Sequence, residues 1–339
     1  MYSLESQAYF HTHIAFNKPY FQSIFCSYYF AMNRGILFTA LSALLYGCIG
    51  YFGARLLALG LSVNNMLFWR FFCSSILLLP SLIILVRRYN LSKHVKALSS
   101  LFVIGGLFHG SGTAFYFEAS KSIGTGLAMV IFFAYPIFVV ALSFFLKKTP
   151  VSRITLGALF LIILGCALIA SGGSTATSFD LRGLLLALMS GLCYGIYVFY
   201  SKDLSQGLSP LLSTLCVCLG SMCIFVVYIS FGSHNFQVPD SQEAWVLLSL
   251  FALFGTVLPV LLLLAGIKYL SASTASIISV LEPVVVLGVG AVLLDEPLQA
   301  VQLIGAMIIL SATILVYLKP QTRATDENNR FKKRHRHTA

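Results

Sequence analysis

The chain contains ten apolar stretches that are each long enough to cross a lipid bilayer as a helix. The hydrocarbon core of a bilayer is about 30 Å thick, which requires about 20 residues of helix. The connections between the stretches are short, so they leave no room for a soluble domain. We therefore predict an all-α integral membrane protein. The predicted spans are residues 35–57, 65–86, 98–118, 124–146, 153–171, 181–200, 210–231, 244–266, 272–294 and 299–318.

The composition is that of a membrane protein rather than of a soluble domain. Of the 339 residues, 58% are hydrophobic and 10% are charged, whereas a soluble domain carries about 25% charged residues. Seven of the eight cysteines lie inside the apolar stretches and form neither a CxxC pair nor a Cys/His cluster. We interpret them as packing residues, and we expect no disulfide framework, no metal and no cofactor.

The basic residues are concentrated on one side of the predicted topology. If both termini are cytoplasmic, eighteen of the 22 lysines and arginines lie on the cytoplasmic side, and only Arg55, Lys121 and Arg182 lie on the other. The positive-inside rule selects this orientation, which we expect in a bacterial inner membrane. The chain has no basic face interleaved with exposed aromatic residues, so the net charge of +11 does not indicate nucleic-acid binding.

The two ends of the chain carry weaker signals. Residues 1–34 are predicted to form a cytoplasmic N-terminal leader, because they lack the basic start and apolar core of a signal peptide. Met32 stands directly before the first span and is an alternative start that the sequence leaves open. Residues 319–339 form a basic cytoplasmic tail, which we interpret as anchoring the topology rather than as a regulatory lipid-binding element.

The chain repeats itself after 147 residues. Residues 121–168 align with residues 268–315 without a gap, and ten of the 48 positions are identical. Each copy contains five spans, and because five is odd the second copy enters the membrane from the opposite side. We therefore predict two inverted five-helix repeats, 35–171 and 181–318, with a substrate site near the midplane between them. The identical pairs include Lys121 and Lys268, Ala128 and Ala275, Pro136 and Pro283, and Pro150 and Pro297.

Four motifs resemble the EamA-like family of the drug/metabolite transporter superfamily. The resemblance implies ten spans, cytoplasmic termini and export or uptake of small metabolites, and it implies no particular substrate. The first copy departs from the family pattern, since many members have Trp at the position of Tyr46 and an acidic residue near Thr149. The motifs are Tyr46-Gly47 with Tyr194-Gly195, Trp69-Arg70-Phe71 followed by an apolar run to Pro80, Leu281-Glu282-Pro283, and Asp295-Glu296-Pro297-Leu298.

Three ionisable side chains inside the spans are candidates for binding substrate. Glu282 lies near the middle of its span, where a carboxylate must face a cavity, find a partner or be protonated. It either binds a substrate amine or a proton, or it ties down the kink at Pro283. His109 lines a cavity or bonds to a neighbouring helix. Arg70 binds an anion or snorkels to the membrane surface as an anchor.

Four tyrosines at mid-depth are further candidates. A tyrosine offers a flat apolar face and one hydroxyl, which suits a small amphipathic metabolite. Ordinary packing between helices is the alternative for each of them. The prolines paired by the repeat, Pro136 and Pro283, are candidate gate hinges. The four tyrosines are Tyr46, Tyr135, Tyr194 and Tyr197.

These features favour a secondary transporter that moves an amino acid or a related small metabolite by alternating access. The expected partners are the small-molecule substrate and the lipid bilayer, with proton or exchange coupling. An integral membrane enzyme is disfavoured, because the candidate groups lie on separate helices and no catalytic or nucleotide-binding motif is visible. A membrane protein that does not transport is the other alternative. Substrate, direction, coupling ion and oligomeric state stay open.

Overall fold

The computed structural model describes residues 18–88, 91–172, 180–231, 236–293 and 298–317, and all regular structure in these ranges is helical. The Asp295-Glu296-Pro297 motif and the basic tail lie outside the described residues. The helices are α2 (Lys18–Tyr46), α3 (Ile49–Ala58), α4 (Val63–Arg88), η1 (Leu91–His94), α5 (Val95–Ile104), η2 (Gly105–Gly110), α6 (Ser111–Ile123), α7 (Thr125–Phe132), α8 (Tyr135–Lys147), α9 (Arg153–Gly172), α10 (Leu181–Leu204), α11 (Pro210–Phe231), α12 (Gln242–Ala252), η3 (Leu253–Val257), α13 (Leu258–Gly266), α14 (Ala272–Ser279), α15 (Glu282–Leu293) and α16 (Ala300–Tyr317).

Eight helical segments in the described part of the chain are long and apolar enough to cross a membrane. The other two predicted spans coincide with α4, which has 26 residues and includes Arg70, and with α16, whose apolar stretch is shorter. The prediction of an all-helical multi-pass chain is therefore confirmed, whereas the count of ten spans is not. The eight segments are Ala31–Ala58, Val95–Ile123, Leu127–Lys147, Arg153–Ser171, Leu181–Leu204, Pro210–Phe231, Gln242–Gly266 and Ala272–Leu293.

The first helix begins earlier than the sequence predicts. α2 starts at Lys18 rather than at residue 35, so it runs through the predicted end of the leader. Pro19 is no obstacle, because a proline is tolerated in the first turn of a helix. Gly35 does not start the helix either: a Cβ at this position would lie 2.8 Å from the Cβ of Tyr269. The glycine serves close packing between helices instead.

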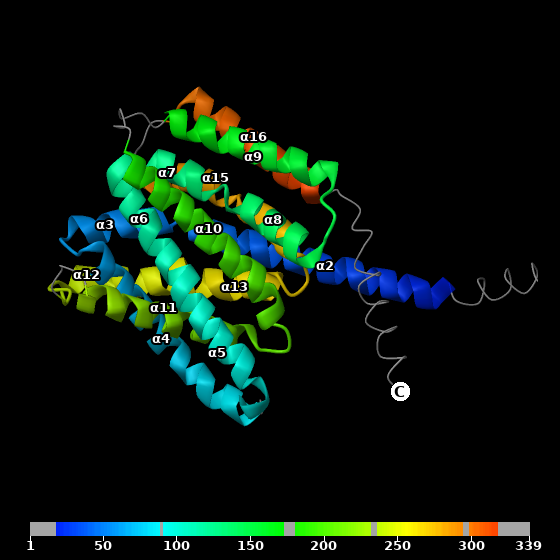
Figure 1. The fold of residues 1–339 in the computed structure, drawn as a ribbon, viewed down its shortest axis with the longest axis horizontal. Coiled ribbons are helices and arrows are strands. Elements are labelled where there is room, and N and C mark those ends of the chain that lie inside the picture. Colours follow the sequence, from blue (N-terminus) through cyan, green and yellow to red (C-terminus); the bar gives the residue numbers. More distant parts are fainter. Residues whose placement is uncertain (1–17, 89–90, 173–179, 232–235, 294–297, 318–339) are drawn as a thin grey trace, which may run out of the picture.

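Helices from the two halves of the chain pack in pairs (Figure 1). α9 packs on α16, α4 on α11, and α8 on α14. α2 packs on α13 and α10 on α6. If each helix is exchanged with its repeat counterpart, the α9–α16 and α4–α11 pairs map onto themselves. The α2–α13 and α10–α6 pairs map onto each other. The pairing therefore fits a pseudo-two-fold relation between the halves, as expected for a duplicated chain.

The helix irregularities also follow the repeat. The π-helical segments η2 and η3 begin at residues 105 and 253, and the interruptions before α8 and α15 fall at Phe133-Ala134 and Val280-Leu281. Pro136 and Pro283 stand just after these interruptions. A proline lacks the N–H that would continue the preceding helix, but it fits the first turn of a new one. A further interruption, at Gly47-Cys48, has no counterpart in the continuous α10.

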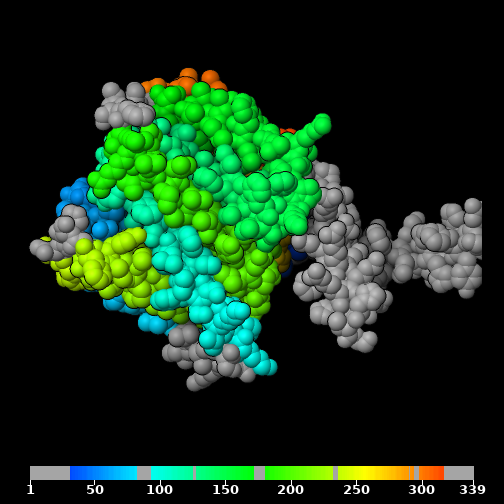
Figure 2. Space-filling model, viewed as in Figure 1, coloured from blue at the N-terminus to red at the C-terminus, as the bar shows by residue number. Residues whose placement is uncertain are grey.

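Close backbone contacts hold the two halves together. A Cβ at Gly105 would lie 2.6 Å from the Cα of Val217, and one at Gly106 would lie 2.6 Å from the carbonyl oxygen of Gly220. Figure 2 shows the cyan surface of α5 directly against the yellow-green surface of α11. Large apolar side chains on the outside, such as Phe145, suit contact with lipid rather than with water.

Candidate functional site

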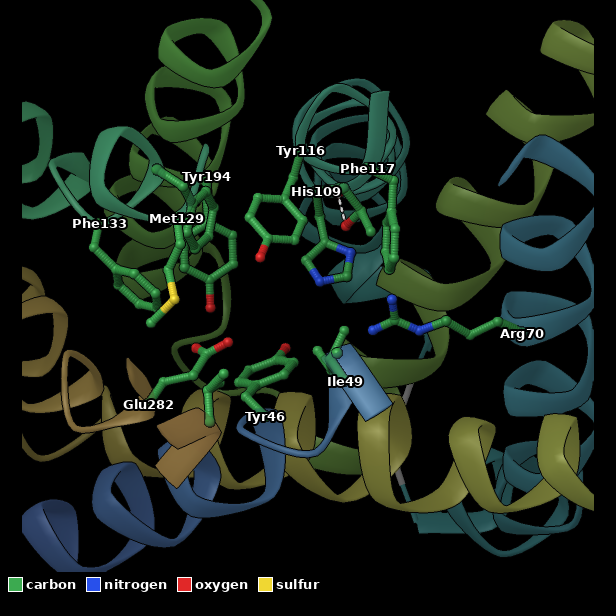
Figure 3. Close-up of a pocket in the computed structure, with 14 residues that line it drawn as sticks. Tyr46, Ile49, Arg70, His109, Tyr116, Phe117, Met129, Phe133, Tyr194 and Glu282 are labelled. Atoms are coloured by element: carbon green, nitrogen blue, oxygen red, sulfur yellow. Dashed lines mark hydrogen bonds between the residues drawn. The ribbon is translucent and has the colours of Figure 1, made fainter. Parts of the chain in front are cut away.

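A pocket lies at the meeting point of both halves of the bundle. Its empty space, which includes open solvent at its mouth, is about 730 Å³. Most of the wall is apolar or aromatic, and three side chains are ionisable (Figure 3). The lining residues are Tyr46, Ile49, Gly50, Arg70, His109, Thr113, Tyr116, Phe117, Met129, Phe132, Phe133, Tyr194, Glu282 and Val286.

Arg70, on α4, is buried at one end of this pocket, with 1% of its surface exposed. Its Nε donates to Thr256 Oγ1 at 2.6 Å and its Nη2 to the carbonyl of Gly255 at 2.7 Å. The guanidinium carbon also lies 4.5 Å from the ring centroid of Phe251. The remaining nitrogen, Nη1, has no hydrogen-bond partner among the described residues. The anchoring interpretation is therefore wrong, because Arg70 does not extend to the membrane surface.

The helical segment that accepts the hydrogen bonds of Arg70 explains why these two oxygen atoms are available. Gly255 and Thr256 belong to η3, a π-helical segment in which the hydrogen-bond register changes. Such a wide turn leaves backbone carbonyls free for side-chain donors. Two of the three guanidinium nitrogens are thereby fixed, and Figure 3 shows the group pointing into the pocket beside His109.

Glu282 faces the same pocket from the other end. It is the first residue of α15, directly after the interruption in that span. Figure 3 places its carboxylate beside Tyr46 and Tyr194, across the pocket from Arg70. Within the described ranges, the carboxylate makes no hydrogen bond and no ion pair. The kink-fixing alternative has no support in these contacts, because the described residues show no hydrogen bond between the Glu282 carboxyl group and the backbone.

His109 combines both of its predicted roles. It lies in η2 with 2% of its surface exposed, and its Nδ1 lies 3.3 Å from Ser221 Oγ on α11. Since Ser221 Oγ donates to the carbonyl of Gly105 at 2.9 Å, it accepts from His109, which assigns the proton to Nδ1. Nε2 is then an acceptor. The ring lines the pocket while it packs against the neighbouring helix.

The four predicted tyrosines fall into two groups. Tyr46 and Tyr194 line the pocket, whereas Tyr135 and Tyr197 do not. Tyr135 donates its hydroxyl to the carbonyl of Ser276 at 3.0 Å, and its ring meets that of Tyr194 edge-on at 4.8 Å. Tyr197 is fully buried against His109, with ring centroids 4.8 Å apart. The structure therefore places these two predicted tyrosines behind the pocket, where they pack against residues that form its wall.

Sequence reasoning missed most of the apolar wall. The chain has 28 phenylalanines, so residue type alone does not distinguish a wall residue from a core residue. Only the position of Phe132 and Phe133, at the proline-marked interruption, offered a signal. The other missed residues are Ile49, Gly50, Thr113, Tyr116, Phe117, Met129 and Val286.

The bundle is closed on one side of the interruptions. α8 packs on α14, where Tyr135 bonds to Ser276 and Ser273 Oγ lies 3.3 Å from Ser143 Oγ. By the repeat, α8 corresponds to α15 and α14 corresponds to α7, so α15 would be expected to pack on α7. Over their described lengths, however, these two helices are not packed on each other. The pocket-lining residues on α3, α7 and α15 all lie on this other side of the interruptions, where α7 and α15 are not packed together.

Two lysines add to the closure at the far end of the packed side. Lys202 Nζ donates to the carbonyl of Ile267 at 2.6 Å and to that of Lys268 at 3.2 Å. Lys268 Nζ in turn donates to the carbonyl of Leu208. Partial burial lowers the pKa of the Lys268 ammonium. The two lysines tie the end of α10 and the loop that follows it to the loop after α13.

A multi-pass helical bundle with a pocket between its two halves has the architecture of a membrane transporter for a small molecule. The family profile described as the EamA-like transporter family matches residues 33–171 and, a second time, residues 181–318. The chain belongs to this family. The resemblance seen in the motifs is thereby confirmed.

Individual relatives agree with this assignment. The chain is 24% identical to the threonine/homoserine exporter RhtA of Salmonella typhimurium strain LT2, over 65% of this chain and 73% of the relative. It is 22% identical to the uncharacterized transporter YxxF of Bacillus subtilis strain 168, over 86% and 92%. A protein of known crystal structure aligns with a TM-score of 0.69 at 15% identity, over 84% of this chain and 96% of that one. The structural likeness shows the fold alone.

Proposed function

We propose that this chain is a secondary transporter of the inner membrane that moves a small zwitterionic metabolite of the amino-acid type. The observation that carries the proposal is that a basic and an acidic side chain lie at the two ends of the pocket. Arg70 Nη1 and the Glu282 carboxylate have no partner among the described residues. A substrate carboxylate would bind Arg70, and a substrate ammonium would bind Glu282.

An unpaired charge in an apolar bundle is costly. Removing an ion from water costs several kcal/mol unless a partner compensates, about 2.5–3.5 kcal/mol on membrane-insertion scales. A zwitterion supplies both missing partners at once. A metabolite with only one charge would leave the other end uncompensated, which gives the site a reason to select zwitterions.

The surroundings of each charge suit these two groups. The planar guanidinium of an arginine matches the geometry of a carboxylate. A primary ammonium has three donors, and the Glu282 end offers the carboxylate together with Tyr46 Oη, which is buried without a partner among the described side chains. Figure 3 shows the hydroxyls of Tyr116 and Tyr194 pointing to the same space. This end is therefore rich in acceptors.

The one-sided closure supports alternating access as the transport mode. In the predicted topology the loops after α8 and α10 are cytoplasmic, so the packed α8–α14 side is the cytoplasmic one. The pocket then belongs to an outward-facing conformation. Rocking the halves about their pseudo-two-fold relation would release α8 from α14 and bring α7 onto α15. RhtA, named as an exporter of threonine and homoserine, supports an amino acid as cargo.

The test uses the purified full-length protein and a panel of end-blocked ligands. Thermal stabilisation is measured with amino acids, with their methyl esters, which lack the carboxylate, and with their N-acetyl derivatives, which lack the ammonium. We expect stabilisation only by the intact zwitterions, followed by their flux in proteoliposomes. Equal stabilisation by esters or N-acetyl derivatives would contradict the two-charge site. Binding without flux would indicate a membrane protein that does not transport.

A further inference from the structure

Three serines of the bundle bury their hydroxyls without a hydrogen-bond partner. Ser201 on α10, Ser205 directly after it and Ser213 on α11 are each 0% exposed, and within the described ranges their hydroxyls make no hydrogen bond. Most other buried serines donate to a backbone carbonyl, as Ser143 does to that of Val139 at 2.7 Å. A hydroxyl that leaves water without gaining a partner costs free energy. These three hydroxyls therefore do not stabilise the conformation that the structure shows.

The repeat relates each position on the packed side of the bundle to one on the open side. Residues before η2 correspond to residues 148 further along the chain, and residues after it to residues 147 further along, because η2 has six residues and η3 has five. A pair of counterpart hydrogen bonds agrees with both offsets. Ser42 donates to the carbonyl of Pro259 and Ser190 donates to that of Gly112, both at 2.7 Å. Counterparts can therefore be assigned residue by residue.

The counterparts of the pocket wall are buried on the packed side, and several carry hydroxyls. Residues of α3 and α7 that line the pocket correspond to residues of α10 and α14. These counterparts are between 0% and 4% exposed. Apolar wall residues thus correspond to tyrosine and serine. The pairs are Ile49 with Tyr197, Met129 with Ser276, and Phe132 with Ser279.

Ser201 and Ser205 continue the face of α10 on which Tyr197 lies. Residues four apart are neighbours on one side of a helix, so Tyr197, Ser201 and Ser205 follow one another along α10. At one end, the ring of Tyr197 lies 4.8 Å from that of His109 in the pocket wall. At the other end, Ser205 follows the last residue of α10, near Lys202, which ties this end to the loop after α13. The row of hydroxyls therefore leads from the pocket wall to the far end of the packed side.

We propose that this face of α10 lines the route by which the substrate leaves the pocket on the packed side, and that Ser201 and Ser205 bind its polar groups on the way. The inference rests on the proposed function. In the present conformation the route is closed, and the two hydroxyls have no partner. When the halves rock, this part of α10 takes the relation to the pocket that α3 has now, and the hydroxyls meet water and substrate. The open side offers mainly apolar and aromatic side chains, whereas the packed side offers hydroxyls.

Alanine variants separate this role from a structural one. A buried hydroxyl without a partner disfavours the closed packed side by roughly fivefold or more, and alanine removes that bias toward opening. Ser201→Ala and Ser205→Ala should therefore melt at the same or a higher temperature than the wild type. Zwitterion affinity at the open pocket should change less than twofold, while flux in proteoliposomes should fall at least about fivefold. Ser75→Ala is the matched control, because Ser75 is a buried serine whose hydroxyl donates to the carbonyl of Phe71 at 2.8 Å, and its flux should be unchanged.

A labelling experiment tests the opening of the route without relying on flux. Ser201→Cys nearly keeps the size of the side chain, and the full-length variant in proteoliposomes is treated with a charged, membrane-impermeant thiol reagent. Mass spectrometry of its peptides reports the labelling rate of each cysteine. The native Cys166, 2% exposed on α9, serves as the buried reference. We expect Cys at position 201 to be labelled at least tenfold faster than Cys166.

The outcomes separate this inference from the proposed function. Unchanged flux in both alanine variants would overturn the inference, as would labelling in Ser201→Cys that is no faster than that of Cys166. Lower melting temperatures of the alanine variants would show that the hydroxyls stabilise the fold, and this too would overturn it. If the wild-type protein moves none of the amino acids in the panel, the proposed function fails. The labelling then decides the route alone, since fast labelling supports it and slow labelling overturns it.

Discussion

Replacing Arg70 by lysine should separate its structural contacts from substrate binding. Arginine reaches Thr256 and Gly255 with two nitrogens and still presents a third to the pocket. Lysine carries its three donors on one nitrogen, so this nitrogen must share a single position between the two helix contacts and a substrate carboxylate, whereas arginine reaches them from separate nitrogens. Polar contacts between membrane helices average about 0.6 kcal/mol each. Losing both should therefore cost about 1 kcal/mol of stability.

The loss of ligand affinity in Arg70→Lys should be larger than the loss of stability. A hydrogen bond to a charged group contributes about 1.5–3 kcal/mol, which corresponds to roughly 10- to 150-fold in the dissociation constant of a zwitterion. The assay compares the melting temperature and the ligand affinity of the variant with those of Arg55→Lys. Arg55 is the matched control, because it forms an exposed pair with Glu243 at 3.1 Å and such pairs contribute little. Wild-type affinity in folded Arg70→Lys would refute the assignment of Nη1 as the carboxylate ligand.

Two further predictions concern Glu282 and the contact between α8 and α14. Glu282→Gln keeps the shape of the side chain but removes its charge, so it should abolish zwitterion binding and flux in a folded protein. The control is Glu118→Gln, which alters an exposed pair with Lys121 and should leave binding and flux unchanged. Wild-type flux in Glu282→Gln would exclude Glu282 from the substrate site. Cysteines at both Ser143 and Ser273, whose hydroxyl oxygens lie 3.3 Å apart, should form a disulfide that holds α8 on α14 and stops flux until a reductant is added. Flux that persists in the oxidised double variant would contradict rocking at this contact.

Parts of the fold follow directly from local chemistry, and other parts depend on contacts between distant segments. The interruptions of the fourth and ninth spans lie where the paired Pro136 and Pro283 predict a defect, because proline cannot donate to the preceding turn. The π-helical segments have no such marker. η2 contains Gly105 and Gly106, where α11 comes so close that an added Cβ would lie 2.6 Å from its backbone. No local sequence pattern predicts this contact between distant helices.

The site was predictable where charge forces a side chain inward. Arg70, His109 and Glu282 all line the pocket, because an ionisable group in an apolar helix cannot face lipid without a large cost. Tyrosine carries no such constraint. Tyr135 and Tyr197 pack behind the wall, since their orientation depends on how each helix is rotated in the bundle. The apolar wall was not predictable for the same reason.

The repeat is also broken at the residues that carry charge. Tyr135 occupies the position that corresponds to Glu282 at an offset of 147 residues, and the positions 147 and 148 residues after Arg70 hold Val217 and Cys218. Each copy therefore contributes one charge of the proposed site. Two identical copies would surround the pseudo-two-fold axis with two arginines and two glutamates, and a zwitterion could then bind in either of two opposite orientations. With Arg70 from one copy and Glu282 from the other, a zwitterion has a single orientation, with its carboxylate toward α4 and its ammonium toward α15.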